Sequence, residues 1–335
     1  LFGEKSIDQL PELDKQALKE SFKTNVNKIK NPSEFSYTPF FITFSHHFNN
    51  LLSGHAKSFA DAKNKKTPGF SDVFDQQNGL NSGITAFGKE LITQYLLSRK
   101  NGRRILIDTK HMSLKGRDDY AKIVDTYRAQ GDEVPIICSH TAINGIPTRA
   151  EAAKAKDTNK LDEKSYISRW DINLTDQDII EIFDSQGIIG ILMHDGRMPG
   201  GKFKKLFKEF KKGMYDNRES INRLHSQMFL TNMFHIAKIN LAHIRSNNAK
   251  NNTEKIDEKE AWSTLCLGSD NDGIVDPFDH YNTASTLDEF KNRLLKHMKL
   301  NFKSYMKQFR IVCVDRNSCN FFTKEELTDL MTGYS

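Results

Sequence analysis

Five apolar segments of the sequence each end in a side chain that can bind a metal ion or transfer a proton. The five end residues are His46, His111, His140, His194 and Asp270. Imidazole and carboxylate groups are the usual protein ligands of zinc and similar ions. One histidine in such a position means little, but four of the eleven histidines share it and an aspartate joins them. The pattern therefore predicts a metal site.

The segments that carry these residues are short and rich in β-forming residues, and helical patterns separate them. Strand-like runs span 39–46, 104–111, 134–140, 187–194 and 263–270. Helical periodicity covers 8–30, 85–98, 116–129, 202–212, 218–246, 287–306 and 323–331, and a further helix begins at Thr175. Strands that alternate with helices indicate a parallel sheet. Because no glycine-rich phosphate loop follows any strand, a nucleotide-binding doubly wound fold loses support.

We therefore predict an α/β fold of the (β/α)8 TIM-barrel type, which collects its active site at the C-terminal ends of its strands. Five strands of the eight are visible, so the first three are expected to be missing from this chain. The predicted organisation is one partial barrel domain over residues 1–335, with a polar insertion at 144–171 and C-terminal helices at 287–335.

Composition and charge favour a soluble globular protein with no membrane segment. The chain is 37% hydrophobic with a net charge of +6, and it contains no run of about 18 apolar residues. Its densest basic run, 202–212, has apolar residues at helical spacing, which leaves the lysines on a solvated face and argues against nucleic-acid binding. The chain starts at Leu1 without a signal-peptide pattern, so we expect a processed or truncated start, and the compartment stays open between cytoplasmic and periplasmic.

The four cysteines do not form a metal motif. Cys138 and Cys266 lie inside apolar strand-like runs and are expected to be buried, whereas a pairing of Cys313 with Cys319 is left open. The run Ser269–Gly273 could also be a calcium loop or a plain turn. An EF-hand loop would close on a glutamate at its twelfth position, where this chain has Tyr281, so that alternative is weak.

Five segments resemble, in order and context, the motifs of the membrane (renal) dipeptidase family of the amidohydrolase superfamily. They are TFSHHFN at 43–49, NGLNSGITAFG at 78–88, IDTKHMS at 107–113, ICSHTA at 137–142 and GSDNDG at 268–273. Each motif is weak alone, but five in the same order are a strong signal. The resemblance spans residues 39–280.

The resemblance implies a binuclear zinc site that hydrolyses dipeptides. His111 and His140 would ligate the second zinc, Asp270 would act as acid and base on the bridging water, and His46 would polarise the scissile carbonyl or stabilise the oxyanion. His194 matches no family ligand, so it is taken as a structural residue by default. The remaining histidines are taken as structural or surface residues, with the loop residue His55 the least certain. They are His47, His55, His225, His235, His243, His280 and His297.

Two departures from the family pattern matter. The family holds its first metal with a His-x-Asp pair and bridges both metals with a glutamate, and neither occurs here, so only half of the ligands for two zinc ions are visible. We expect an N-terminal segment or partner chain to supply the missing strands. The second departure is Ile172, which stands where the family has an arginine for the substrate's carboxylate; Arg169 is the nearby substitute.

The sequence thus predicts a zinc-dependent hydrolase that cleaves the amide bond of dipeptides through a metal-bridged hydroxide, complete only with its N-terminal segment. The alternative is a catalytically inactive pseudoenzyme or assembly subunit of the same fold. A basic nucleic-acid-binding module is a third interpretation, which nothing in the residue spacing requires. A homodimer is left open.

Overall fold

The structure is a computed structural model that describes residues 10–59, 76–100, 102–155, 165–212, 218–251, 254–271 and 276–308. The chain divides into two compact units, which are considered separately. The first unit comprises the residues up to Ser139 together with Asp184–Ile188. The second comprises His140–Phe183 and the residues from Ile189 onward. A single domain over the whole chain stays a prediction.

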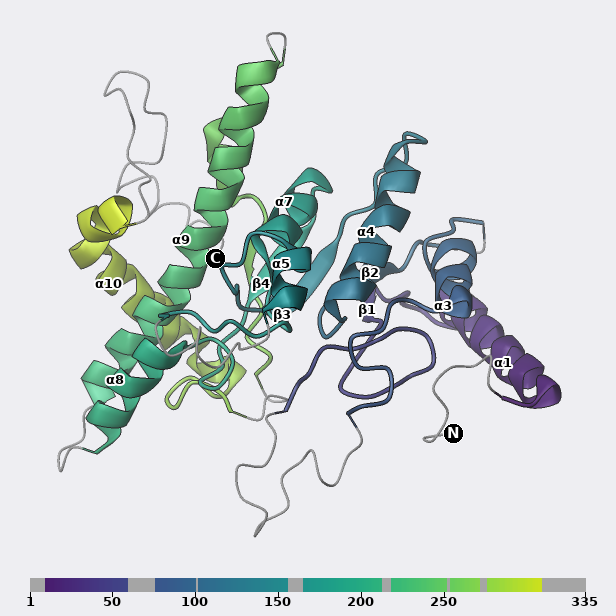
Figure 1. Ribbon diagram of the computed structural model, residues 1–335, viewed down its shortest axis with the longest axis horizontal. Coiled ribbons are helices and arrows are strands. Elements are labelled where there is room, and N and C mark those ends of the chain that lie inside the picture. The colour runs from purple at the N-terminus through teal and green to yellow at the C-terminus, as the bar shows by residue number, and fades with distance from the viewer. Residues whose placement is uncertain are drawn as a thin grey trace. The chain divides into compact units, whose positions relative to one another are not determined.

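The first unit contains parallel strands β1 (Phe41–Thr43), β2 (Leu106–Asp108) and the start of β3 (Ile137–Thr141). Thr43 pairs with Asp108, and Asp108 pairs with Ile137, so the strands lie in the order of the chain. The helices of this unit are α1 (Glu12–Lys30), α3 (Ala86–Glu90) and α4 (Leu114–Arg128) (Figure 1). Strands β1 and β2 are shorter than predicted, and they end three residues before His46 and His111 respectively.

The predicted helix over 85–98 is split. After α3 the chain continues as the π-helix η2 (Leu91–Leu96), in which the Leu97 amide donates to the carbonyl of Ile92. The end of η2 is capped by Lys30, a fully buried residue whose ammonium donates to the carbonyls of Tyr95 and Ser98. Burial lowers the pKa of Lys30, and the charge of Arg104 adds to this. The last residue of α1 therefore anchors that helix to η2.

The second unit contains the end of β3, β4 (Ile188–Ile191) and β5 (Leu265–Leu267). The Leu192 amide donates to Thr141, and Ile189 pairs in parallel with Leu265. The helices are α5 (Arg149–Lys154), α7 (Asp176–Asp184), α8 (Gly201–Lys211), α9 (Arg218–Lys250) and α10 (Leu287–Gln308). The short helices η3 (Glu258–Trp262) and η4 (Ala284–Thr286) precede β5 and α10. The long helix α9 buries Leu230, Phe234 and Ile244 in the core.

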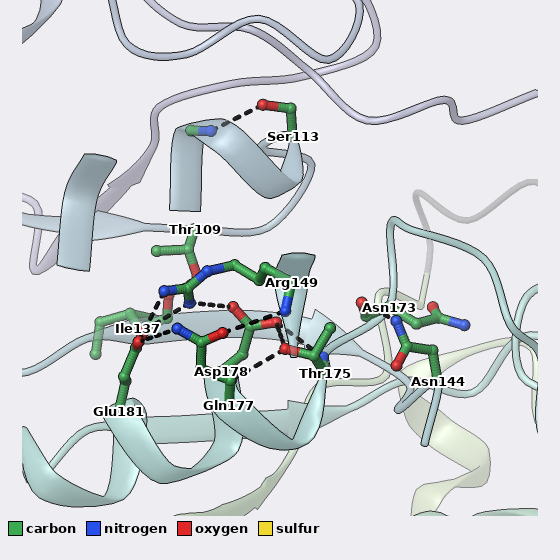
Figure 2. Close-up of polar contacts among 11 residues, drawn as sticks. Thr109, Ser113, Ile137, Asn144, Arg149, Asn173, Thr175, Gln177, Asp178 and Glu181 are labelled. Carbon is green, nitrogen blue, oxygen red and sulfur yellow. Dashed lines mark hydrogen bonds and ion pairs between the residues drawn. The ribbon is translucent and has the colours of Figure 1, made fainter. Parts of the chain in front are cut away.

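A buried ion network joins α5 to α7 within the second unit (Figure 2). The guanidinium of Arg149 donates to Asp178 at 2.9 Å and to both carboxylate oxygens of Glu181 at 2.6 and 2.7 Å. Asp178 also accepts from the amide and the hydroxyl of Thr175. Arg149 lies in the predicted polar insertion, so that segment contributes to the interior as well as to the surface.

Other predictions concern the cysteines, the last helix and membrane-spanning segments. Cys138 is buried as expected, but Cys266 is exposed on β5, so the prediction for Cys266 was wrong. Cys313, Cys319 and the predicted helix at 323–331 lie outside the described residues. No helix in the described part of the chain is both long and apolar enough to cross a membrane.

Candidate functional site

Four of the five predicted strand-end residues occupy the same position in their local structure. His46, His111, His194 and Asp270 each lie three residues after the end of a strand, at Thr43, Asp108, Ile191 and Leu267 respectively. His140 lies within β3. In parallel α/β folds, this is the edge of the sheet where binding residues collect.

The first unit brings together a histidine cluster, made of His46, His47 and His111. One nitrogen of each imidazole lies within 4.8 Å of the other two. The ring centroids are 3.8 Å apart for His46 and His47, 4.6 Å for His46 and His111, and 4.7 Å for His47 and His111. The three residues differ in solvent exposure: His46 is exposed, His47 is half-buried and His111 is buried. His47, which the sequence left without a role, is therefore part of the candidate site.

An asparagine turn positions the first two histidines of the cluster. The amide group of Asn50 donates to the carbonyl of Phe44 at 2.7 Å, and its oxygen accepts from the amides of Leu52 and Ser53 at 3.0 Å. Leu51 takes a φ of 66°, a left-handed conformation that is uncommon for leucine. These bonds close the chain around residues 44–53 and place His46 and His47 on the turn.

The backbone of His111 is also held in a left-handed conformation, with a φ of 66°. Its carbonyl accepts from the amide of Ala56 at 2.8 Å, and the Ser113 amide donates to the carbonyl of Gly54 at 3.2 Å. Gly54 is required there because a Cβ atom would lie 2.0 Å from the carbonyl oxygen of Ser82. The segment that follows the asparagine turn is thus bonded directly to the backbone of His111.

Asp108 anchors the start of the turn that leads to His111. This fully buried carboxylate accepts from the Thr43 hydroxyl at 2.8 Å, the Lys110 amide at 3.0 Å, and the Ser139 amide and hydroxyl at 2.9 and 2.7 Å. It therefore ties together the C-terminal ends of β1, β2 and β3 within the first unit. Ser113 then caps α4 by accepting from the Gly116 amide at 2.8 Å (Figure 2).

The second unit brings together His140 and Asp270. The His140 Nε2 atom lies 3.7 Å from a carboxylate oxygen of Asp270, which also has a left-handed φ of 57°. Strained backbone at a non-glycine residue is concentrated at functional positions, and both His111 and Asp270 have it. Burial lowers the pKa of Arg197, while the negative charge of Asp270 acts against that shift. Arg197 is thus a charged neighbour of Asp270 that the sequence did not single out.

The side chain of Arg169 bonds to backbone groups of the protein. Its guanidinium donates to the carbonyls of Asn144 and Gly145 at 2.8 and 2.7 Å. Ile172 is buried, and the adjacent Asn173 donates from its side chain to the carbonyl of Arg197 at 3.0 Å. A substrate-binding role for Arg169 stays a prediction.

A second group of side chains that could hold a metal ion lies in the second unit. This ion-pair cluster comprises Asp195, His225 and Asp279, whose ligand atoms lie within 4.8 Å of one another, and the ammonium of Lys211. His225 Nε2 lies 2.8 Å from Asp195, and Lys211 lies 2.8 Å from Asp279 and 3.7 Å from Asp195. His225 is buried and stacks on Phe278 at 4.2 Å. The sequence missed this cluster because His225 lies within the first third of the long helix α9, where no strand-end pattern marks it.

Three of the other histidines that the sequence took as structural or surface residues have hydrogen-bond partners in the structure. His235 bonds to Asp176 at 2.6 Å, His55 to the Gln76 carbonyl at 3.0 Å and His243 to Asn247 at 3.0 Å. His194 accepts from the amide of Gly196 at 2.9 Å and lies 3.9 Å from Asp276. Its default structural assignment stays a prediction.

The donor set of the histidine cluster fits a zinc-type ion. Three imidazoles are neutral nitrogen donors, and zinc in catalytic sites is commonly held by three protein ligands with one position left for water. The preference of imidazole for zinc, copper, iron and nickel over magnesium and calcium points to the same class of metal.

No protein-family model and no curated protein match this sequence. Solved structures do. A metallopeptidase from Rhodobacter sphaeroides, liganded with a phosphinate mimic of the dipeptide L-Ala-D-Ala, is 15% identical with a TM-score of 0.36, over 64% of this chain and 41% of its own. The dipeptidase AC, a metallopeptidase, is 16% identical with a TM-score of 0.35, and the match covers 64% of this chain and 43% of that protein's chain. The probable dipeptidase PvdM from Pseudomonas aeruginosa is 16% identical with a TM-score of 0.33, and the match covers 76% of this chain and 55% of that protein's chain.

The dipeptidase AC is a member of metallopeptidase family M19. This chain spans about half of the length of these solved structures or less. The α/β class and the parallel pairing of the strands are present in the described residues, whereas the closed barrel and its three missing strands stay predictions.

Proposed function

We propose that this protein is a zinc-dependent hydrolase that cleaves the amide bond of dipeptides. The observation that carries the proposal is the histidine cluster, which gathers three imidazoles after the ends of β1 and β2. The order of five sequence motifs supplies the substrate class. When bound, zinc lowers the pKa of a coordinated water and polarises a carbonyl oxygen.

The residues of this chain would bind the metal, transfer the proton and stabilise the oxyanion. His111 and His140 are proposed as metal ligands, following the motif order. Asp270 is proposed as the acid and base, with His140 at 3.7 Å to orient its carboxylate. His46 is exposed, so its imidazole is accessible to a substrate, and in this role it would steady the oxyanion.

The proposed N-terminal segment or partner chain would cover the outermost strands. Among the described strands, β1 pairs only with β2, and Phe40, which precedes it, is 64% exposed. On β5 the side chain of Leu267 is 44% exposed. Strand edges with exposed apolar side chains are usually covered in stable proteins, which supports additional strands at both places.

The alternative is a catalytically inactive pseudoenzyme or assembly subunit. Ile172 favours it, because a buried isoleucine stands where the resemblance expects an arginine for the substrate's carboxylate. Arg169, the nearby candidate, donates to two backbone carbonyls. A retained metal without hydrolysis of any dipeptide would support this alternative.

The test uses the full encoded protein. We expect close to two zinc ions per chain, hydrolysis of dipeptides that chelation abolishes, and a loss of at least about 100-fold in kcat for Asp270→Asn. Asp288→Asn, at an exposed position in the first turn of α10, serves as the control and should retain activity. An intact protein without zinc, or activity that survives chelation, would contradict the proposal.

A further inference from the structure

The helix α8 carries a dense array of lysines on its solvent side. Five lysines and a single glutamate lie within the eleven residues Gly201–Lys211, and Lys212 follows at the end of the helix. The helix α4 differs, because three aspartates accompany its four basic residues and both of its lysines form ion pairs one turn away. Like charges one turn apart destabilise a helix, so a negatively charged partner would stabilise α8. We propose that α8 binds the surface of an anionic phospholipid bilayer.

The lysine face of α8 consists of Lys205, Lys208 and Lys212, which are all exposed. They follow one another at spacings of three and four residues, so they lie on one side of the helix. Phe203 and Phe207 lie on the opposite side and are buried. The apolar side of α8 is therefore used for packing within the protein, and binding at the lysine face would depend mainly on charge.

The helix is held in place by the rest of the second unit. The ring of Phe207 lies 5.1 Å from that of His225 on α9, measured between centroids (Figure 1). At the end of α8 the ammonium of Lys211 lies 2.8 Å from a carboxylate oxygen of Asp279. The lysine face is thus formed before any partner binds, and such preorganisation lowers the entropic cost of binding.

The margin of the lysine face favours a lipid surface over a nucleic acid. Tyr166 is 46% exposed, and the ammonium of Lys202 lies 4.9 Å from its ring centroid. Leu206 and Phe210 are half-buried beside the lysines. Exposed tyrosine next to basic side chains is typical of the headgroup region of a membrane, and lysine clusters on amphipathic helices bind anionic lipids. The helix contains no arginine, the residue that nucleic-acid-binding proteins prefer for phosphate.

The test is co-sedimentation of the full chain with phosphatidylcholine vesicles that contain about one-third phosphatidylserine, at an ionic strength of about 0.1 M. Replacing all three residues of the lysine face with glutamine should weaken binding by at least about 50-fold, because each lysine near such a surface contributes about fivefold. The matched control removes the same charge from three exposed lysines of α1, α3 and α9 and should bind nearly as the parent does. Its substitutions are Lys28→Gln, Lys89→Gln and Lys238→Gln.

Two further measurements use the parent and a conservative variant. Raising the ionic strength to about 0.5 M should release the parent from the vesicles, because salt shortens the reach of the charges. The variant with Lys205→Arg, Lys208→Arg and Lys212→Arg keeps the charge and should bind as the parent does. Circular dichroism confirms that each variant is folded. If the glutamine variant does not fold, the salt dependence of the parent decides, and binding that persists at high salt would overturn the proposal.

The remaining outcomes separate this proposal from its alternatives. A parent that does not bind the anionic vesicles, or an equal loss in the two glutamine variants, would contradict it. Tighter binding of double-stranded DNA than of vesicles, lost in the glutamine variant of the lysine face, would also overturn it in favour of a nucleic-acid surface. The zinc content and dipeptide hydrolysis of that variant in solution should equal those of the parent, so this proposal and the hydrolase can fail independently.

Discussion

The histidine cluster and the ion-pair cluster both bring three potential metal ligands within 4.8 Å, yet they differ in charge. The histidine cluster consists of three imidazoles and contains no carboxylate. The ion-pair cluster contains two carboxylates that already contact the ammonium of Lys211. Burial lowers the pKa of Lys211, but the hydrogen bond to Asp279 and the charges of Asp195, Asp279 and Asp276 hold it above its usual value.

The two clusters are also held by different forces. Hydrogen bonds of Asn50, of the backbone and of the buried carboxylate of Asp108 fix the turns of the histidine cluster, whereas the partly exposed ion pair of Lys211 and Asp279 contributes to the other cluster. The exposed fraction of Lys211 is 48%, and that of Asp279 is 34%, so solvent and salt screen this pair. Proximity of ligand atoms therefore does not by itself define a metal site, because an internal cation can satisfy the same carboxylates.

The largest effect is expected from Asp108→Asn, which tests how the histidine cluster is held. An amide can replace only one of the two carboxylate oxygens that accept four hydrogen bonds in the buried interior. We expect a loss of about 1–3 kcal/mol in the free energy of unfolding, measured by urea denaturation, and weaker zinc binding. Asp118→Asn, which removes an exposed partner of Lys122, should change stability by less than about 0.5 kcal/mol. Equal effects would contradict the role given to Asp108.

A smaller effect is expected from Lys211→Met, which tests the internal cation of the ion-pair cluster. The substitution keeps the apolar stem but leaves Asp195 and Asp279 without their ammonium partner. We expect affinity for Mn²⁺ at this cluster to rise by about tenfold, about 1.4 kcal/mol, as measured by EPR. Lys208→Met on the same helix should leave Mn²⁺ binding unchanged. If both variants behave alike, the ammonium is not what separates the two clusters.

The smallest effect is expected from Asp276→Asn, which probes the negative charge of the ion-pair cluster. Burial raises the pKa of Asp276, as do the charges of Asp195 and Asp279, while Lys211 lowers it. The folded state therefore holds its proton more tightly than the unfolded state, and stability decreases as the pH rises through the raised pKa.

Asp276→Asn should accordingly stabilise the protein at pH 7 by a few tenths of a kcal/mol, because the group is more than half exposed and screened. The gain should disappear below the usual aspartate pKa of about 3.9. Thermal melting at a series of pH values measures both. A variant that is less stable than the parent at neutral pH would contradict the sign of this electrostatic effect.

The sequence alone was sufficient to predict the order of the strands and the long helices, whereas the ends of several strands and the helix α5 were not predicted. Strand-like runs predicted β1 to β5 in the correct order, and the helical periodicity of residues 116–129 and 218–246 corresponds to α4 and α9. These patterns are readable because side chains alternate along a strand and repeat every 3.6 residues along a helix. The same patterns placed His46, His111 and Asp270 at the ends of strands, and in the structure each lies three residues after its strand ends.

Which side chains meet was decided only by the tertiary structure. In an extended strand, neighbouring side chains such as His46 and His47 point to opposite faces, so no periodicity predicts that they share a site. The strand ends at Thr43, and the asparagine turn instead brings their rings to 3.8 Å. Lys211 likewise reaches Asp279 across 68 residues of chain only after the second unit has folded. Local propensities determine the elements, whereas the charge balance and the geometry of a site depend on contacts between residues that are distant in sequence.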